Sequence, residues 1–218
     1  MSGMWPILRK DLVLELRGKE ALSALVLLVL LVLLTFTFAL DPEGVRAAAP
    51  AVLWVTFIFA GLLAVQRTFL LERENGGWYG LLLSPVDRGA IFAAKMTGNL
   101  IVLGVAQVVL LALLVTVIGV EVPTAPLVLL LANALGLLGF SALATLFAAI
   151  TVRLRAREML LPLLVLPLLV PLVICAVQAS RIALDGGGAV GIWLRVLVAF
   201  DVIFVTAGWL LFDQLAQE

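Results

Sequence analysis

Six long apolar stretches constrain the fold of this chain more than any other feature of its sequence. A helix rises about 1.5 Å per residue, so crossing a hydrocarbon layer of about 30 Å takes roughly 20 apolar residues. The stretches cover approximately residues 21–40, 50–70, 93–118, 125–151, 159–179 and 192–212. Apolar runs such as residues 25–34 lack the alternation of a membrane β-strand. The sequence therefore predicts an all-α integral membrane protein with six transmembrane helices.

Composition supports a membrane protein and excludes several functional classes. Hydrophobic residues make up 64% of the chain and charged residues 13%, whereas soluble domains carry roughly 45–50% and about 25%. The net charge is zero, which gives no reason to expect a nucleic-acid partner. Histidine is absent and Cys175 is the only cysteine, so the commonest metal ligand and general base are missing. We expect a single transmembrane domain over residues 1–218, no catalytic residues, no metal and no enzyme activity.

The placement of basic residues predicts the orientation of the spans. Cytoplasmic loops of membrane proteins are enriched in Lys and Arg. Eleven of the 14 basic residues precede the first span or lie between spans two and three or four and five, counting Arg67 and Lys95 at the adjoining span ends. Only Arg46, Arg181 and Arg195 lie on the other side. We therefore expect both termini in the cytoplasm.

The segment before the first span has the pattern of an amphipathic helix. Over residues 5–19, Trp5, Leu8, Leu12 and Leu16 recur at steps of three and four, while charged residues occupy other faces. Such a helix lies in the membrane interface. It is either a surface anchor or an elbow that moves during transport.

The connector between the second and third spans, residues 71–92, combines charges, a glycine pair and a short apolar run. It contains Glu72-Arg73-Glu74, then Gly76-Gly77, and ends the apolar run at Ser84-Pro85. The glycines can break a helix. A short amphipathic helix between two long ones is available for docking to a partner. The alternative is a solvated connector.

These residues carry a resemblance to a known family. The Glu-Arg-Glu, glycine, Leu-Leu-x-Ser-Pro pattern resembles the cytoplasmic loop of ABC-2 type permeases, which are six-helix exporters. Together with residues 49–55 and the proline-rich fifth span, it is similar to the haem exporter permease family CcmB of bacterial cytochrome c maturation. The resemblance implies that the loop couples to a separate ATPase subunit. The residues implied in coupling are Glu72, Arg73, Glu74, Gly76, Leu82, Ser84 and Pro85.

The same resemblance implies a function, partners and a location. The chain would be the permease subunit of an ABC transporter in the bacterial inner membrane, coupling ATP hydrolysis by its partner to release of a haem-loaded chaperone. The implied partners are a CcmA-like ATPase, a CcmC-like haem-handling membrane protein, a small CcmD-like membrane subunit, a periplasmic CcmE-like chaperone and lipid. Without histidine, only Cys175, four methionines and Tyr79 could ligate haem. We expect no cofactor on this chain, because haem and ATP would be bound by partners. The alternative within the superfamily is an exporter of another substrate.

Two features inside the spans are further candidates. Pro162, Pro167 and Pro171 interrupt the fifth span; each of the last two removes a helix hydrogen bond, so this helix should be bent or locally unwound as a hinge, or statically kinked. Asp201 lies in the middle of the sixth span. An unpaired carboxylate at that depth is costly, so it should be protonated or paired with groups such as Asn133 or Gln107. A proton-coupled secondary transporter acting through Asp201 is the alternative function.

The fourth span carries small residues at helical spacing. Ala132, Gly136 and Phe140 recur at steps of four, with Gly139 beside them. Small residues let membrane helices approach closely, so this pattern predicts packing.

Overall fold

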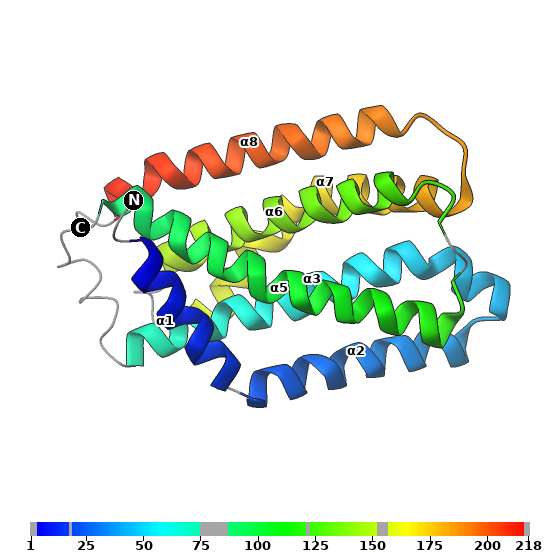
Figure 1. The fold of residues 1–218 in the computed structure, drawn as a ribbon, viewed down its shortest axis with the longest axis horizontal. Helices are drawn as coiled ribbons and strands as arrows, with labels where there is room; N and C mark the ends of the chain where they lie inside the picture. The colour runs from blue at the N-terminus through cyan, green and yellow to red at the C-terminus, as the bar shows by residue number, and fades with distance from the viewer. Residues whose placement is uncertain (1–3, 18, 75–86, 121–122, 152–156, 216–218) are drawn as a thin grey trace.

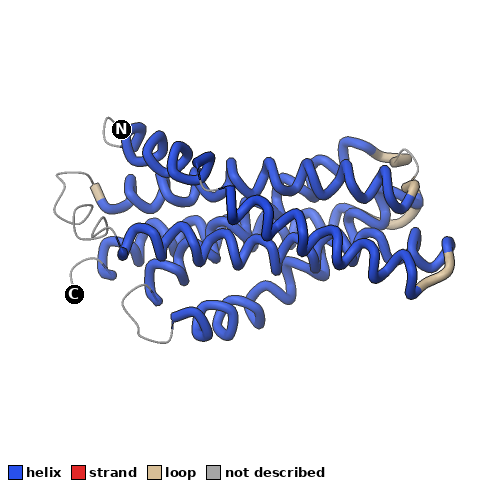
Figure 2. Tube along the Cα trace, turned by 90° about the horizontal axis from the view of Figure 1, so that it is seen from below, coloured by secondary structure: helices blue, strands red, loops and turns tan. Residues whose placement is uncertain are grey.

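The computed structural model describes residues 4–17, 19–74, 87–120, 123–151 and 157–215. Every regular element in these residues is a helix, as Figure 2 shows. The elements are α1 (Met4–Arg17), α2 (Lys19–Ala39), α3 (Pro42–Glu74), α5 (Arg88–Ile118), α6 (Pro126–Thr151), α7 (Arg157–Asp185) and α8 (Val190–Leu215). The prediction of an all-α membrane protein is confirmed.

The long helices lie side by side along one axis, and α1 crosses their end at an angle (Figure 1). Both chain termini lie at that same end, which we call the terminal end. Helix α3 finishes there and α5 begins there. The opposite end, which we call the loop end, carries the turn between α2 and α3 and the connections into α6 and α8.

Five helices in the described residues have the length and apolar composition of a membrane span. They are Pro42–Gln66, Arg88–Ile118, Pro126–Thr151, Met159–Asp185 and Val190–Phe212. Helix α2 has 21 residues, which at about 1.5 Å each make it roughly 30 Å long. Within α2, residues Val26–Ala39 form an apolar helix that is shorter than the five others. These helices correspond to the six stretches in the sequence.

The second membrane helix starts earlier than its apolar stretch. It begins at Pro42 rather than at residue 50, and Pro50 lies inside it. The Asp41 carboxylate accepts a hydrogen bond from the backbone N–H of Gly44 at 3.1 Å. A carboxylate cap followed by proline in the first turn favours a helix start at this position.

Helix α6 packs against α3 through a glycine and an indole. A Cβ atom on Gly136 would lie 2.2 Å from the ring of Trp54, so only glycine lets the two helices approach this closely. Trp54 is fully buried and its Nε1 donates to Ser180 Oγ of α7 at 3.0 Å. Its ring meets Phe57 edge to face. The predicted packing role of the small residues on α6 is borne out at this contact.

Polar side chains connect α5 to α6 inside the bundle. Asn99 Nδ2 donates to Thr145 Oγ1 at 2.9 Å, and Gln107 Nε2 donates to Asn133 Oδ1 at 2.7 Å. Asn133 also donates to the carbonyl of Leu129. Hydrogen bonds between membrane helices contribute about 0.6–2 kcal/mol each. They fix the register of α5 against α6.

Helix α7 runs without interruption from Arg157 to Asp185, with all three prolines inside it. The predicted local unwinding is therefore absent, and the hinge stays a prediction. Pro167 and Pro171 lie on the exposed side of α7, while Val165, Leu169 and Leu172 of the opposite side are buried. Among the residues that the structure describes, no part of the chain covers Pro167 and Pro171.

The contact between Gly136 and Trp54 generates a stability prediction. Replacing Gly136 by Ala places a methyl group inside the indole, so it should lower the free energy of unfolding by about 1–3 kcal/mol. Gly104→Ala is the matched control, because its Cβ would lie at an ordinary 3.4 Å from Leu137, and it should change stability by less than about 1 kcal/mol. SDS titration of the purified protein in mixed micelles measures both. Equal stability of the two variants would contradict this packing.

Candidate functional site

The predicted coupling residues flank and fill the connection between α3 and α5. Glu72, Arg73 and Glu74 are the last three residues of α3, which ends at the terminal end. Gly76, Leu82, Ser84 and Pro85 lie outside the described residues. The candidate site is therefore described through the helices that enter and leave this connection.

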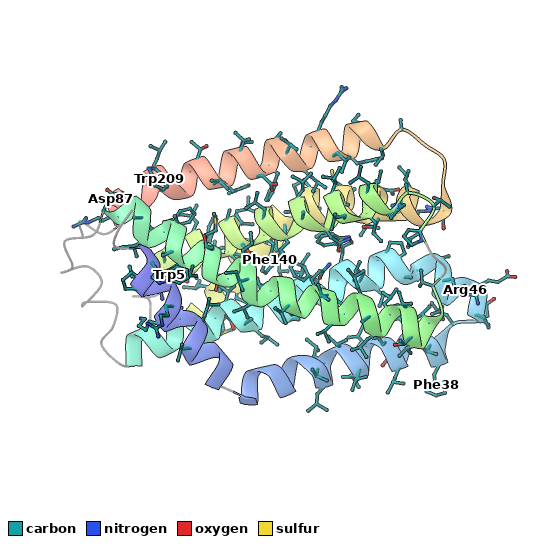
Figure 3. The ribbon with its side chains drawn as sticks, in the orientation of Figure 1. Trp5, Phe38, Arg46, Asp87, Phe140 and Trp209 are labelled. Carbon is teal, nitrogen blue, oxygen red and sulfur yellow. The ribbon has the colours of Figure 1, made fainter. Side chains whose placement is uncertain are left out.

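The start of α5 is capped and then held against α8. The Asp87 carboxylate accepts a hydrogen bond from the N–H of Ala90 at 3.2 Å, which caps the helix. A Cβ on Gly89 would lie 2.7 Å from the Trp209 ring. Figure 3 shows Asp87 and Trp209 together at the terminal end. The glycine directly behind the cap thus lets the indole of α8 lie on the backbone of α5.

A second contact of the same kind lies one turn further along α5. A Cβ on Gly208 would lie 2.1 Å from the ring of Phe92, so here the glycine is on α8 and the aromatic ring on α5. The Phe92 and Phe212 rings pack at a centroid distance of 5.8 Å. The two glycine and aromatic contacts interlock the first turns of α5 with the last turns of α8.

A buried ion pair fastens the same part of α5 to α1. Lys95 Nζ lies 2.8 Å from Asp11 Oδ2, and the side chains are 1% and 7% exposed. A Cβ on Gly98 would lie 3.6 Å from Leu8, so the helices are also in van der Waals contact one turn on. Buried charges are tolerated when they are paired at good geometry. The start of α5 is therefore held by α1 through this pair and by α8 through aromatic rings.

Helix α1 contacts the bundle through part of its apolar pattern and through Asp11. Ile7 and Leu8 are buried, and Asp11 follows them on the same side. Trp5, predicted for the apolar face, is 68% exposed and projects from the terminal end (Figure 3). The separate helix before the first span is confirmed. The helix contacts the bundle through Ile7, Leu8 and Asp11, and its place in the membrane interface stays a prediction.

Sequence reasoning missed the pair of Asp11 and Lys95. Lys95 looked like one of the basic residues that mark the cytoplasmic side, and Asp11 like a residue of the polar face. The available signal was the position of Lys95, since α5 is apolar from Gly89 to Ala94 and carries no charge after Lys95. A lysine inside an apolar helix needs an acidic partner.

The remaining candidates are not brought together with this site. Asp201 lies in the interior of α8, eight residues before Trp209, which is about 12 Å along the helix. The predicted pairing of Asp201 with Asn133 or Gln107 is wrong, because those two side chains bond to each other instead. Within the described ranges, no group of three or more His, Cys, Asp or Glu residues could hold a metal ion.

The ion pair generates a prediction that is independent of any activity. Lys95→Met leaves the buried Asp11 carboxylate with only the exposed Lys10 beside it, so it should lower the free energy of unfolding by about 3 kcal/mol. Adding Asp11→Leu to Lys95→Met removes the orphaned charge and should restore most of the loss. SDS titration in mixed micelles measures the free energy of unfolding of the wild-type chain, of Lys95→Met and of the double variant.

Lys10→Met is the matched control for this prediction. Lys10 also approaches Asp11, at 3.4 Å, but its side chain is 44% exposed, so its loss should cost less than about 1 kcal/mol. A buried ion pair at this position would be contradicted if Lys95→Met lowered the free energy of unfolding no more than Lys10→Met does.

Comparison with known proteins places the whole chain in one family. Residues 2–212 match the model of the family described as CcmB protein. The chain is 32% identical to heme exporter protein B of Pseudomonas aeruginosa over 91% of each chain. It is 31% identical to heme exporter protein B of Rhodobacter capsulatus over 84% of each chain. With heme exporter protein B of Bradyrhizobium diazoefficiens it shares 26% identity over 95% of this chain and 94% of the relative. On this evidence the chain belongs to the CcmB family.

Proposed function

We propose that this chain is the membrane permease subunit of an ABC-type system for haem export or delivery in c-type cytochrome biogenesis. The observation that carries the proposal is the match over nearly the whole length of both chains to relatives named heme exporter protein B. The apolar helices support a membrane protein, and the name of the relatives supports a transport component. ATP hydrolysis would belong to a separate CcmA-like subunit.

In this proposal the terminal end faces the cytoplasm of a bacterium. Eleven of the 14 basic residues precede the apolar part of α2 or lie near the connections from α3 to α5 and from α6 to α7 in the sequence, in agreement with the enrichment of basic residues in cytoplasmic segments. Arg46 lies at the loop end (Figure 3) and is one of the three on the other side. The ATPase would therefore dock on the connection between α3 and α5.

The packing around α5 supports a mechanical route for coupling. Closure of the ATPase subunits would push on residues 72–85 and so displace the start of α5. This part of α5 is interlocked with α8 at Gly89 and Gly208 and bonded to α1 through Lys95. Close-packed contacts transmit displacement because they resist compression. A push on the connection would then move α1, α5 and α8 together.

Helix α7 offers a place where the bundle could change shape. Pro162, Pro167 and Pro171 leave gaps in its hydrogen bonding, and the last two lie on the exposed side. Bending at these residues would leave the packed side against α6 in contact. We propose them as the hinge of α7.

Haem would be the cargo of the complex and not a resident group of this chain. The sequence has no histidine, and Cys175 is buried in α7. A CcmC-like membrane protein and a CcmE-like chaperone, with a small CcmD-like subunit, would hold haem, and the permease would drive release of the loaded chaperone. A mechanical role of this kind needs no haem ligand.

The proposal predicts that charge reversal at the end of α3 uncouples the system. Glu72→Lys with Glu74→Lys should give a folded membrane protein that binds the ATPase roughly tenfold or more weakly, because like charges in an interface cost several kcal/mol. The measurements are co-purification of the ATPase and c-type cytochrome levels in a strain that depends on this chain.

Glu43→Lys provides the matched control, since Glu43 is an exposed acidic residue at the other end of the same helix. It should leave both readouts unchanged. Normal co-purification together with normal cytochrome levels in the Glu72 and Glu74 variant would count against the proposal.

A further inference from the structure

Asp201 is a buried carboxylic acid for which the proposed mechanism has no use. It lies in the interior of α8 and is 4% exposed. Both carboxylate oxygens are buried, and neither has a hydrogen-bond partner in the part of the chain that the structure describes. Buried polar atoms without partners are rare in native proteins, and each calls for a physical explanation.

The carboxyl group lies against the backbone of α6. A Cβ on Gly139 would lie 2.5 Å from Asp201 Oδ1. The same Cβ would lie 2.7 Å from Leu172 of α7 and 2.9 Å from Phe200 of α8. Three helices therefore converge at this glycine, and the carboxyl group of Asp201 lies against it.

In the part of the chain that the structure describes, Asp201 forms no ion pair with the helices around it. Helix α6 contains no charged residue at all. The charged residues of α7 lie near its ends and are Arg157, Glu158, Arg181 and Asp185. The charged residues of α5 are Arg88 and Lys95, both within its first eight positions. Lys95 pairs with Asp11. On α8 itself, Arg195 is six residues away and exposed, and Asp213 is twelve residues away, or about 9 and 18 Å along the helix.

An ionised carboxylate in these surroundings would lose its water without gaining a cation or a donor. That loss costs at least several kcal/mol in apolar surroundings, and proteins avoid it by neutralising the group. Water does not reach either oxygen. The neutralising ligand that fits without moving the helices is a proton.

We propose that Asp201 is a proton-binding site at the junction of α6, α7 and α8, and that the bundle in this conformation holds it as the neutral acid. Proton release would leave a carboxylate that needs water, which it can reach only if α8 separates from α6 at Gly139. The contact between these two helices is therefore linked to the proton. This inference does not depend on the identity of the transported substrate or of the ATPase.

Infrared spectroscopy of the full chain in lipid bilayers tests the proposal. The protein is prepared with ordinary aspartate and with aspartate carrying ¹³C in its side-chain carboxyl group, at neutral pH. A protonated aspartic acid gives a carbonyl band that moves to lower frequency with the label, whereas glutamic acids are unaffected. We expect one such band in the wild-type chain and its loss in Asp201→Asn, which keeps the shape of the side chain and its neutral charge.

Asp185→Asn is the control, since Asp185 is exposed and lies 3.6 Å from Arg181; it should leave the band in place. A wild-type spectrum without a label-sensitive band of a protonated acid would overturn the proposal, and this outcome needs no variant to fold. A band that persists in Asp201→Asn would overturn it as well.

Discussion

Close approach of helices at glycine is the constraint on which this bundle depends. In lipid, apolar side chains gain little by leaving their surroundings, so membrane helices associate through tight packing and hydrogen bonds. Helix α6 meets both needs without a single charged residue. Gly136 accommodates the ring of Trp54, and Gly139 accommodates Asp201, Leu172 and Phe200. The helices around α6 are positioned by these contacts.

Close approach of helices at glycine also occurs at the terminal end, next to the connection of the proposed coupling. Gly89 and Gly208 each accept an aromatic ring from the opposite helix, and the ion pair of Lys95 and Asp11 adds α1 to the unit. The connection that we propose as the ATPase docking site leads directly into this unit. A force applied there would reach three helices, because none of them can move without disturbing buried contacts of the others.

Much of the fold could be predicted from the sequence, and the failures have physical causes. Apolar length identified the spans, because a bilayer imposes one length on every helix. Helix α3 starts at Pro42 because an aspartate cap lies outside the apolar stretch. The pair of Asp11 and Lys95 was missed because the two residues lie 84 positions apart in the sequence, and local periodicity contains no information about such a partner.

The partners of the interior polar groups could not be predicted from the sequence either. Asp201 was identified as unusual from its position in an apolar helix, but its expected partners were wrong. Gln107 and Asn133 are on α5 and α6, and they face each other, whereas Asp201 faces Gly139. Which polar residues meet depends on the rotation of each helix about its axis, and that rotation is determined by the glycine contacts.

In the proposed function an ATPase acts on the connection between α3 and α5. Photo-crosslinking from single positions detects such a contact. A photoreactive residue in place of Leu82 should form an adduct with the ATPase subunit in native membranes. The same residue in place of Phe38, which is exposed at the loop end, should form none. The account would be contradicted if Leu82 gave no ATPase adduct, or if Phe38 gave one.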